Sequence, residues 1–275
     1  MYCGSEVKQG ATLSLRVSVL GSGSGGNCTL VATESTRLLV DAGFSRRDTL
    51  RRLAAIGESA GPIDAILISH EHSDHVSGLV SLAKALSKER PVPVFVTEIT
   101  RHNIIFDEGA VLPAFEYIRP GHRFTIGDIE VDAFTIPHDA ADPVAFTFCS
   151  QGLRAAVCTD LGYVPESVKH QLHGCQILVL ESNHDLEMLK VGPYPWHIKQ
   201  RVMSRTGHLS NNAVADYVEQ DLDADLQVLV LAHLSENNNH PAIARLSAEQ
   251  ALEARGAAPK LVLAYQKDPT EIFRF

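Results

Sequence analysis

Short hydrophobic stretches with a two-residue period dominate the first quarter of the chain and predict strands. Residues 13–20 (LSLRVSVL) alternate between apolar and polar positions, which is typical of a half-buried strand. Residues 29–33 and 37–43 have the same character and flank turn residues at 34–35, so we expect them to pair as a hairpin. The run at 63–69 (IDAILIS) is apolar almost throughout, as in a strand that is buried on both faces.

Helical periodicity follows two of these strands. Residues 45–57 place Leu50, Leu53 and Ile56 on one face of a predicted helix. Residues 76–89 repeat apolar positions at the same spacing and predict a second helix.

The second half of the chain repeats this arrangement, and its predicted strands end near polar or metal-binding residues. The four stretches are 124–138, 144–160, 176–182 and 226–234. The residues at their ends, or one position before, are His138, Asp160, Glu181 and His233. Helical spacing is found near 182–190, 196–205, 211–220 and 241–254. We therefore expect one site along the edge of packed sheets, in a single domain of residues 1–275 that no linker divides.

Length and composition are those of a globular protein with a substantial core. The chain has 275 residues, of which 45% are hydrophobic and 21% charged. It has no apolar run of about 18 residues and no signal-peptide pattern at its start, so we expect a cytoplasmic protein. The scattered cysteines favour reduced thiols over disulfides or a cysteine zinc site; they are Cys3, Cys28, Cys149, Cys158 and Cys175.

The formal net charge of −9 disfavours a protein that coats nucleic acid, so a polyanionic substrate would need a local positive field. The segment 190–205 lacks acidic residues and carries Lys190, Lys199, Arg201 and Arg205. Its Tyr194 and Trp196 are candidates for stacking on a base, although a solvated helix with Trp196 in the core explains the same pattern. A second candidate strip for a phosphate backbone consists of Arg46, Arg47, Arg51 and Arg52.

A glycine-rich loop at 21–26 (GSGSGG) has the spacing of a dinucleotide-binding motif, with Asp41 near the position of a ribose-binding acid. That motif requires a helix to begin at its third glycine. The residues that follow are β-branched, interrupted by turn residues and too few for a helix and a strand, so we reject a dinucleotide site. The glycine N–H groups remain candidates for cupping a phosphate oxygen.

Residues 70–75 (HEHSDH) concentrate three histidines and an aspartate in a predicted loop between a buried strand and a helix. Residues two apart in an extended loop point the same way, so His70 and His72 can converge on one cation. Asp74 and His75 can reach a second cation. The helical zinc-protease pattern HExxH is absent.

Two divalent cations need more ligands than this loop offers, and the predicted strand ends are the natural supply. His138, Asp160 and His233 each follow an apolar run. A single histidine at a strand end is more often a hydrogen-bonded structural residue. Three such residues together with the HxHxDH pattern favour metal binding instead.

The order of these motifs resembles the metallo-β-lactamase-fold hydrolases. The segments that carry the resemblance are DAG, HEHSDH, PHDAADP, TDLGY, LESNHD, GHLSN and LAHLSENNN. PYPWHIKQR and ESNHD further resemble the YycJ/WalJ-type branch of bacterial nucleases, and the similarity extends from the glycine-rich loop to the end of the chain. The superfamily also contains thioesterases and phosphodiesterases, so its name does not imply lactam hydrolysis.

The resemblance implies an α+β protein with a four-layer αβ/βα sandwich of two mixed β-sheets flanked by helices. It also implies two divalent metal ions at the edge between the sheets, with Zn²⁺ favoured and Mn²⁺ or Fe²⁺ as alternatives. The implied ligands are His70, His72 and His138 for the first ion, Asp74, His75 and His233 for the second, and Asp160 as a bridge. Asp41 resembles an acid that orients a ligand imidazole; a cap of the following helix is the alternative.

The charge of such a site favours an anionic substrate. Two divalent ions bring four positive charges, and Asp74, Asp160 and a bridging hydroxide return three. Coordination lowers the pKa of that water to roughly 7, so the nucleophile forms at neutral pH. A leaving oxygen also needs a proton, and by resemblance to tRNA 3′-processing enzymes His208 is the candidate acid and Glu181 its orienting partner. Asp74 is expected to be catalytic as well.

His184 lies close after Glu181 and is a candidate substrate contact, or else it simply begins the next helix. His197 and His240 are weaker candidates. The predicted substrate contacts are thus His184, Trp196, Lys199 and Arg201. The histidines expected to be structural are His102, His122, His170 and His173.

Three functions are compatible with these residues. The branch resemblance favours a DNA exonuclease that cleaves phosphodiester bonds by attack of a metal-activated hydroxide. A hydrolase of a small thioester, lactone or cyclic phosphodiester fits the acidic charge and the absence of a long nucleic-acid-binding arm. A non-catalytic, metal-stabilised regulatory protein is disfavoured by the full ligand set with Glu181 and His208, because a structural zinc site needs only four ligands. The polarity of digestion and the oligomeric state stay open.

Overall fold

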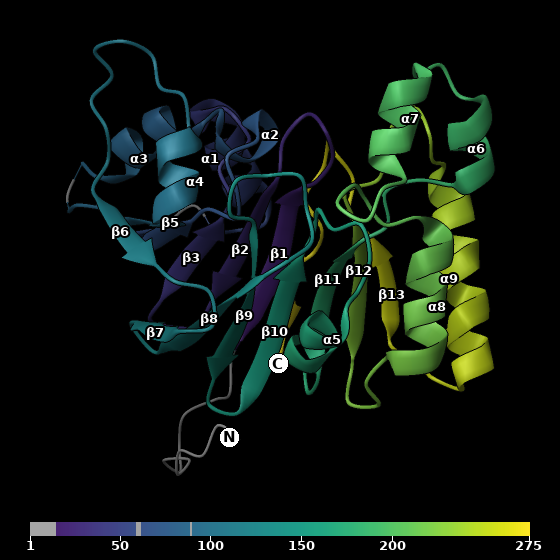
Figure 1. The fold of residues 1–275 in the computed structure, drawn as a ribbon. Coiled ribbons are helices and arrows are strands. Elements are labelled where there is room, and N and C mark those ends of the chain that lie inside the picture. Colours follow the sequence, from purple (N-terminus) through teal and green to yellow (C-terminus); the bar gives the residue numbers. More distant parts are fainter. Residues whose placement is uncertain (1–14, 59–61, 89) are drawn as a thin grey trace.

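Two seven-stranded β-sheets face each other and carry helices on their outer sides (Figure 1). The computed structural model describes residues 15–58, 62–88 and 90–275. Residues 13 and 14 of the first predicted strand, residue 89 of the second predicted helix, and Cys3 lie outside the described residues.

The first sheet is mixed, with antiparallel pairing among β14, β1, β2 and β3 and parallel pairing from β3 to β6. Its strands in spatial order are β14 (Phe273–Arg274), β1 (Arg16–Gly21), β2 (Cys28–Ala32), β3 (Arg37–Val40), β4 (Ala65–Leu67), β5 (Val94–Thr97) and β6 (Phe115–Ile118). The predicted hairpin is confirmed, because β2 and β3 pair with Leu30 opposite Leu39.

The second sheet is also mixed, with antiparallel pairing from β7 to β10 and parallel pairing from β10 to β13. Its strands in spatial order are β13 (Lys260–Leu263), β12 (Val228–Ala232), β11 (Ile177–Glu181), β10 (Leu153–Cys158), β9 (Val144–Ser150), β8 (Ile129–Thr135) and β7 (Arg123–Ile126). Because β10 to β13 are parallel, their carboxyl ends meet at one edge of the sheet.

Helices cover the two outer faces. On the first sheet these are α1 (Arg46–Ala55) and α3 (Leu79–Leu86), with the short α2 (Ser73–Val76) and α4 (Glu98–Asn103) nearby. On the second sheet they are α5 (Glu166–Leu172), α8 (Asn211–Asp221) and α9 (Pro241–Arg255). α6 (Leu186–Val191) and α7 (Trp196–Val202) follow the end of β11 and stand beside that edge of the sheet (Figure 1).

Alternation along the strands divides their side chains between separate cores. In β3, Leu38 and Val40 pack between the sheets with Phe146, whereas Leu39 faces the helices with Leu79. A fully buried aliphatic side chain stabilises the fold by about 1.5–3 kcal/mol. Helices, sheet, sheet and helices thus form four layers, which confirms the predicted sandwich.

α1 differs from the helix that the pattern predicted. Leu50 is 38% exposed, whereas Arg52 is only 4% exposed. Arg52 donates hydrogen bonds to the backbone carbonyls of Leu20 (2.7 Å) and Gln266 (2.9 Å), and its guanidinium lies 4.0 Å from the ring centre of Phe44. Arg52 therefore cannot belong to a surface strip that binds a phosphate backbone.

The HEHSDH segment is not a loop throughout. Asp74 and His75 lie in the single turn of α2, which ends before Gly78. A Cβ atom at Gly78 would lie 1.7 Å from the carbonyl oxygen of Phe44, so only glycine allows this close approach. The predicted second helix, 76–89, corresponds to α3, which begins only after Gly78, and its first residue, Val76, is the last residue of α2. No helix of the described residues is long and apolar enough to cross a membrane.

Candidate metal centre

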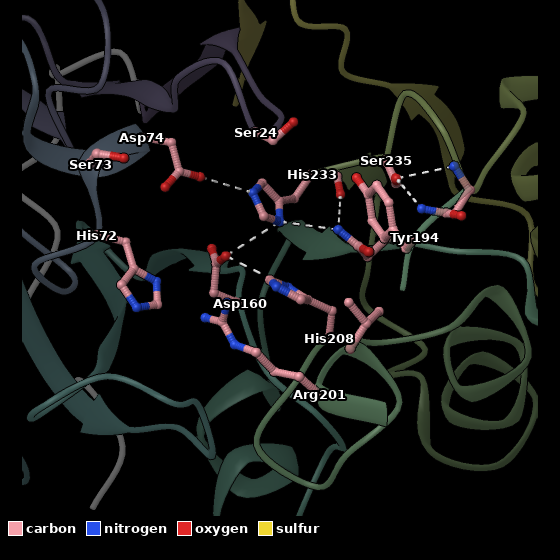
Figure 2. A pocket seen from close by; sticks show the side chains of 13 residues that line it. Ser24, His72, Ser73, Asp74, Asp160, Tyr194, Arg201, His208, His233 and Ser235 are labelled. Atoms are coloured by element: carbon pink, nitrogen blue, oxygen red, sulfur yellow. Dashed lines mark hydrogen bonds and ion pairs between the residues drawn. The ribbon is translucent and has the colours of Figure 1, made fainter. Parts of the chain in front are cut away.

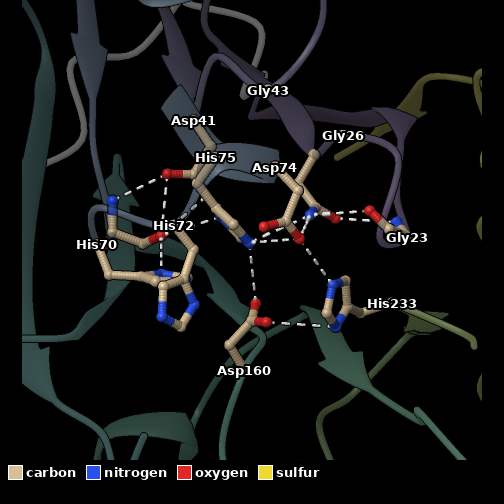
Figure 3. Close-up of polar contacts among 12 residues, drawn as sticks. Gly23, Gly26, Asp41, Gly43, His70, His72, Asp74, His75, Asp160 and His233 are labelled. Atoms are coloured by element: carbon tan, nitrogen blue, oxygen red, sulfur yellow. Dashed lines mark hydrogen bonds and ion pairs between the residues drawn. The ribbon is translucent and has the colours of Figure 1, made fainter. Parts of the chain in front are cut away.

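The ends of five strands bring chemically active side chains to one edge of the packed sheets. His70 follows β4, His138 follows β8, Asp160 follows β10 and His233 follows β12, while Glu181 is the last residue of β11. Figure 3 shows the side chains of the first half of the chain pointing toward those of the second half. The structure thus brings the predicted ligands together although up to 163 residues separate them, from His70 to His233.

His70, His72 and His138 turn ring nitrogens toward one another. Nδ1 of His72 lies 3.1 Å from Nε2 of His70 and 3.2 Å from Nε2 of His138. One lone pair on His72 cannot accept from both neighbours, so hydrogen bonding alone does not explain the arrangement. Zn²⁺–N distances of about 2.0–2.1 Å place tetrahedral nitrogen ligands about 3.4 Å apart, close to the observed spacing. These three side chains fit a divalent cation.

Asp74, His75 and His233 form a second group of donors, and Asp160 lies beside it. Oδ2 of Asp74 lies 3.4 Å from Nε2 of His233 and 3.6 Å from Nε2 of His75, which in turn lies 3.4 Å from Oδ2 of Asp160. That oxygen of Asp160 is buried and has no hydrogen-bond partner among the described residues. A buried carboxylate oxygen without a partner is costly, so this donor set fits a cation as well.

Asp41 fixes the orientation of His75. Its Oδ2 lies 2.8 Å from Nδ1 of His75, and its Oδ1 accepts the backbone N–H of Ser69 at 2.8 Å. A proton on Nδ1 leaves Nε2 of His75 free to face Asp74. The alternative that Asp41 caps α1 is wrong, because Ser45 caps that helix.

Three residues of the site have left-handed backbone conformations, with φ values of 63° at Asp41, 63° at Asp160 and 56° at His233. Gln151 is the only other non-glycine residue with positive φ in the described part of the chain. Such a conformation costs roughly 1–2 kcal/mol and persists where the surroundings impose it. Backbone strain is thus concentrated where the chain turns sharply after a strand and aims a side chain into the site.

Glu181 is fully buried and connects two histidines. Its Oε1 lies 2.8 Å from Nδ1 of His208 and 2.8 Å from Nδ1 of His233. Its Oε2 accepts the backbone N–H groups of Leu161 (3.1 Å) and Leu209 (2.9 Å). One carboxylate therefore positions a predicted metal ligand and the predicted proton donor together.

Electrostatic effects divide the titratable groups into charged and neutral members. Burial by itself raises the pKa of Glu181, but the charge of His208 and hydrogen bonds from both histidines hold that pKa well below its ordinary value. Burial lowers the pKa of His75, but the carboxylates of Asp41 and Asp160 overcome this and raise it to about 9. Without a cation the ring therefore holds a proton on Nε2 at neutral pH, and a metal ion bound at Nε2 would displace that proton. Burial and neighbouring imidazoles lower the pKa of His70, which keeps it neutral and able to bind a cation.

Asn27 was not among the predicted site residues, yet it touches two of them. Its Oδ1 accepts hydrogen bonds from the Ser22 hydroxyl (2.8 Å) and the Gly23 N–H (3.0 Å), which fixes the orientation of the amide. Its Nδ2 then lies 3.3 Å from Oδ2 of Asp74 and 3.1 Å from Nε2 of His75. The available sequence signal was an asparagine within a glycine-rich loop, which by itself indicates only a turn.

The glycine-rich loop links both halves of the site instead of cupping a phosphate. The Ser22 hydroxyl accepts the backbone N–H of His233 at 2.9 Å. The N–H groups of Gly23, Gly25 and Gly26 donate within the protein, to Asn27, Gln266 and Gly23. The predicted phosphate cup is therefore wrong.

The predicted substrate contacts occupy different positions. Arg201 lines the pocket at the site, whereas Trp196 is 63% exposed and His184 is buried, and neither lines the pocket. The alternative that Trp196 lies in the core is wrong. Lys199 is buried and donates to the carbonyl oxygen of Lys190 at 2.7 Å, which contradicts its prediction as a substrate contact.

A pocket of about 340 Å³ opens at the candidate centre (Figure 2). Small-ligand sites are concave and carry a few polar groups that fix orientation. The residues that line the pocket are Ser24, His72, Ser73, Asp74, Asp160, Asn183, Tyr194, Arg201, Val202, His208, His233, Ser235 and Asn238.

Comparison with known proteins agrees with this geometry. Residues 36–257 match the Beta-lactamase superfamily domain. Exodeoxyribonuclease YycJ of Bacillus anthracis is 38% identical over 245 residues, covering 89% of this chain and 91% of that protein. Exodeoxyribonuclease WalJ of Streptococcus pneumoniae is 34% identical over 238 residues, covering 86% and 87%. The structure of the metallo-β-lactamase fold protein YhfI from Bacillus subtilis has a TM-score of 0.68 at 16% identity, covering 96% of this chain and 100% of that one.

The fold and the clustered His and Asp side chains define a metal-dependent hydrolase with the metallo-β-lactamase fold. The chain belongs to the β-lactamase superfamily, which confirms the resemblance seen in the sequence.

Proposed function

We propose that this protein is a DNA exonuclease that depends on two divalent metal ions. The observation that carries the proposal is the convergence of two groups of predicted ligand side chains on one pocket, in a fold shared with hydrolases. Identities of 38% and 34% to two exodeoxyribonucleases over most of the chain support DNA as the substrate.

The two groups of donors divide between two ions. The proposed ligands are His70, His72 and His138 for one ion, Asp74, His75 and His233 for the other, and Asp160 for both. When bound, the ions supply Lewis acidity and a water activated for attack on phosphorus. The three imidazoles suit Zn²⁺, and the mixed group also accepts Mn²⁺ or Fe²⁺.

His208 is the proposed proton donor to the leaving oxygen. Nδ1 of His208 lies 2.8 Å from Glu181, and the side chain lines the pocket, so Nε2 remains for the substrate. Burial lowers the pKa of His208, but the charge of Glu181 and the hydrogen bond to it outweigh burial and raise that pKa. A raised pKa keeps the imidazole protonated near neutral pH, as a general acid requires.

Two residues of the segment 190–205 are proposed to contact the substrate outside the metal ligands. Arg201 lines the pocket, and Trp196 is exposed at the start of α7. A guanidinium pairs with phosphate and an exposed indole stacks on bases.

Degradation assays on defined substrates test the proposal. The protein would be incubated with Zn²⁺, Mn²⁺ or Fe²⁺ and labelled linear DNA, closed circular DNA, RNA or a panel of thioesters. We expect nucleotide release from linear DNA and none from circles, which have no ends. Asp74→Ala should abolish release with an unchanged circular dichroism spectrum, whereas Asp48→Ala, on the exposed face of α1, should have no effect. Turnover of thioesters or RNA without DNA would contradict the proposal.

A further inference from the structure

The pocket has a second wall that contributes no proposed metal ligand. Figure 2 shows Tyr194 and Ser235 across the pocket from His72 and Asp74. Tyr194 precedes α7 and Arg201 lies in that helix, so a short segment of chain presents both a ring and a guanidinium to the pocket. This pairing of groups raises the question of which part of a substrate the wall receives.

The guanidinium of Arg201 has N–H donors that no described residue uses. Its Nε donates to Oδ2 of Asp139, and its two Nη groups have no hydrogen bond or ion pair within the described residues. The side chain is 55% exposed and is the only lysine or arginine among the described residues that line the pocket. A guanidinium held at Nε and free at both Nη atoms can bind a phosphate in a bidentate manner.

Tyr194 offers an aromatic face to the same space. Its hydroxyl accepts a hydrogen bond from Nδ2 of Asn237 at 3.4 Å, and no aromatic ring among the described residues stacks on it. Beside it, Ser235 Oγ accepts the backbone N–H of Asn238 at 3.2 Å, so the hydroxyl proton of Ser235 is available to a ligand. A ring next to hydrogen-bonding groups is suited to a nucleotide base.

We propose that Tyr194 and Arg201 form a subsite for the terminal nucleotide of a DNA strand, with the base stacked on Tyr194 and a neighbouring phosphate bound by Arg201. This inference rests on the proposed function and adds to it the part of the substrate that is recognised. A pocket of about 340 Å³ lies at the lower end of small-ligand sites and accepts one nucleotide rather than a duplex end. The terminal base must therefore leave its stack to enter, and Tyr194 replaces the lost stacking partner.

The test measures KM for degradation of two DNA strands, one whose terminal nucleotide carries its base and one whose terminal nucleotide lacks it. The proteins compared are wild type, Tyr194→Ala and Tyr194→Phe. Removal of the ring should raise KM about 10-fold on the normal strand, which corresponds to the usual strength of base stacking. On the strand with an abasic end, wild type and Tyr194→Ala should have the same KM. Tyr194→Phe should behave as wild type on both strands, because it keeps the ring.

Tyr117→Ala is the matched control, because Tyr117 is 57% exposed on β6 and does not line the pocket. Thermal unfolding of each variant shows whether the fold is intact. The subsite would be overturned if Tyr194→Ala raised KM equally on the normal and the abasic strand, or no more than Tyr117→Ala does. In either case the wild type would still degrade DNA, so the proposed function would stand. A wild-type protein that releases no nucleotide from any DNA would overturn the proposed function itself.

Discussion

Replacement of Asn27 by alanine should weaken one metal site and spare the other. The Asn27 amide lies against Asp74 and His75, which belong to the second group of proposed ligands. The structure gives it no contact with the imidazoles of His70 and His72 within the described residues. A selective effect on the second ion is therefore the specific expectation.

The contacts of Asn27 set the size of the effect. The substitution leaves the Gly23 N–H and the Ser22 hydroxyl without their acceptor, in a loop where Ser22 is only 4% exposed. Each buried donor without a partner costs about 1–3 kcal/mol. The hydroxyl can rotate to another acceptor, so the unpaired Gly23 N–H should lower the free energy of unfolding by about 1–3 kcal/mol. Loss of a group that orients metal ligands typically weakens metal binding about 10- to 100-fold.

Urea unfolding of the metal-free protein measures the first quantity, and titration against a chromophoric chelator measures the second. Asn211→Ala is the matched control, because Asn211 is equally buried and bonded to Ser182 and Asn239 but contacts no proposed ligand. It should lose stability and keep both metal affinities. Equal weakening of both ions in Asn27→Ala, or equal metal binding by the two variants, would refute the reasoning.

Three further predictions concern the charge, the cations and the packing of the site. Glu181→Gln removes the negative charge that keeps His208 protonated and should lower kcat about 100-fold or more in single-turnover assays. A kcat within about threefold of wild type would contradict the role of Glu181 as the partner of the proton donor. Removal of the divalent ions with a chelator should lower the melting temperature by about 5–10 °C in calorimetry, and return of the metal should restore it. Coincident melting curves with and without chelator would argue against bound cations. Gly43→Ala places a Cβ atom 1.8 Å from the Asp74 carbonyl oxygen and should lower the free energy of unfolding in urea by about 3 kcal/mol. In Gly25→Ala the new Cβ meets only a flexible side chain, so the loss should be about 1 kcal/mol. Equal losses in the two variants would refute the packing argument.

The strands and the position of the site could be predicted because their signals are local. Apolar runs such as 63–69 and 226–234 indicate buried strands wherever they occur, and the elements β4 and β12 confirm them. Since the carboxyl ends of parallel strands meet at one edge, residues placed just past those ends are expected to be neighbours. The confirmed fold then explains why Asp160 and His233, which follow β10 and β12 of the second sheet, lie 3.3 Å apart.

Contacts between distant segments could not be predicted in the same way. The Ser22 hydroxyl meets the His233 N–H across 211 residues, and Asn27 meets Asp74 across 47. No periodicity records such pairs, because the partners lie in loops or, for Asp74, in the single turn of α2. The left-handed conformations of Asp41 and Asp160 are similarly imposed by their surroundings.

Two basic residues show where amphipathic patterns fail. The sequence pattern predicted that Arg52 belongs to a strip for a phosphate backbone and that Lys199 contacts the substrate. Both are buried, because backbone carbonyl oxygens accept their hydrogen bonds. A long basic side chain can bury its stem wherever carbonyl groups satisfy its head, so charge alone does not indicate exposure.

The central claim is that side chains from both halves of the chain hold two divalent ions side by side. Anomalous scattering from crystals of the protein grown with Mn²⁺ tests it most directly. We predict two peaks, one among His70, His72 and His138 and one beside Asp74 and His233. A single peak, or peaks away from these residues, would contradict the account.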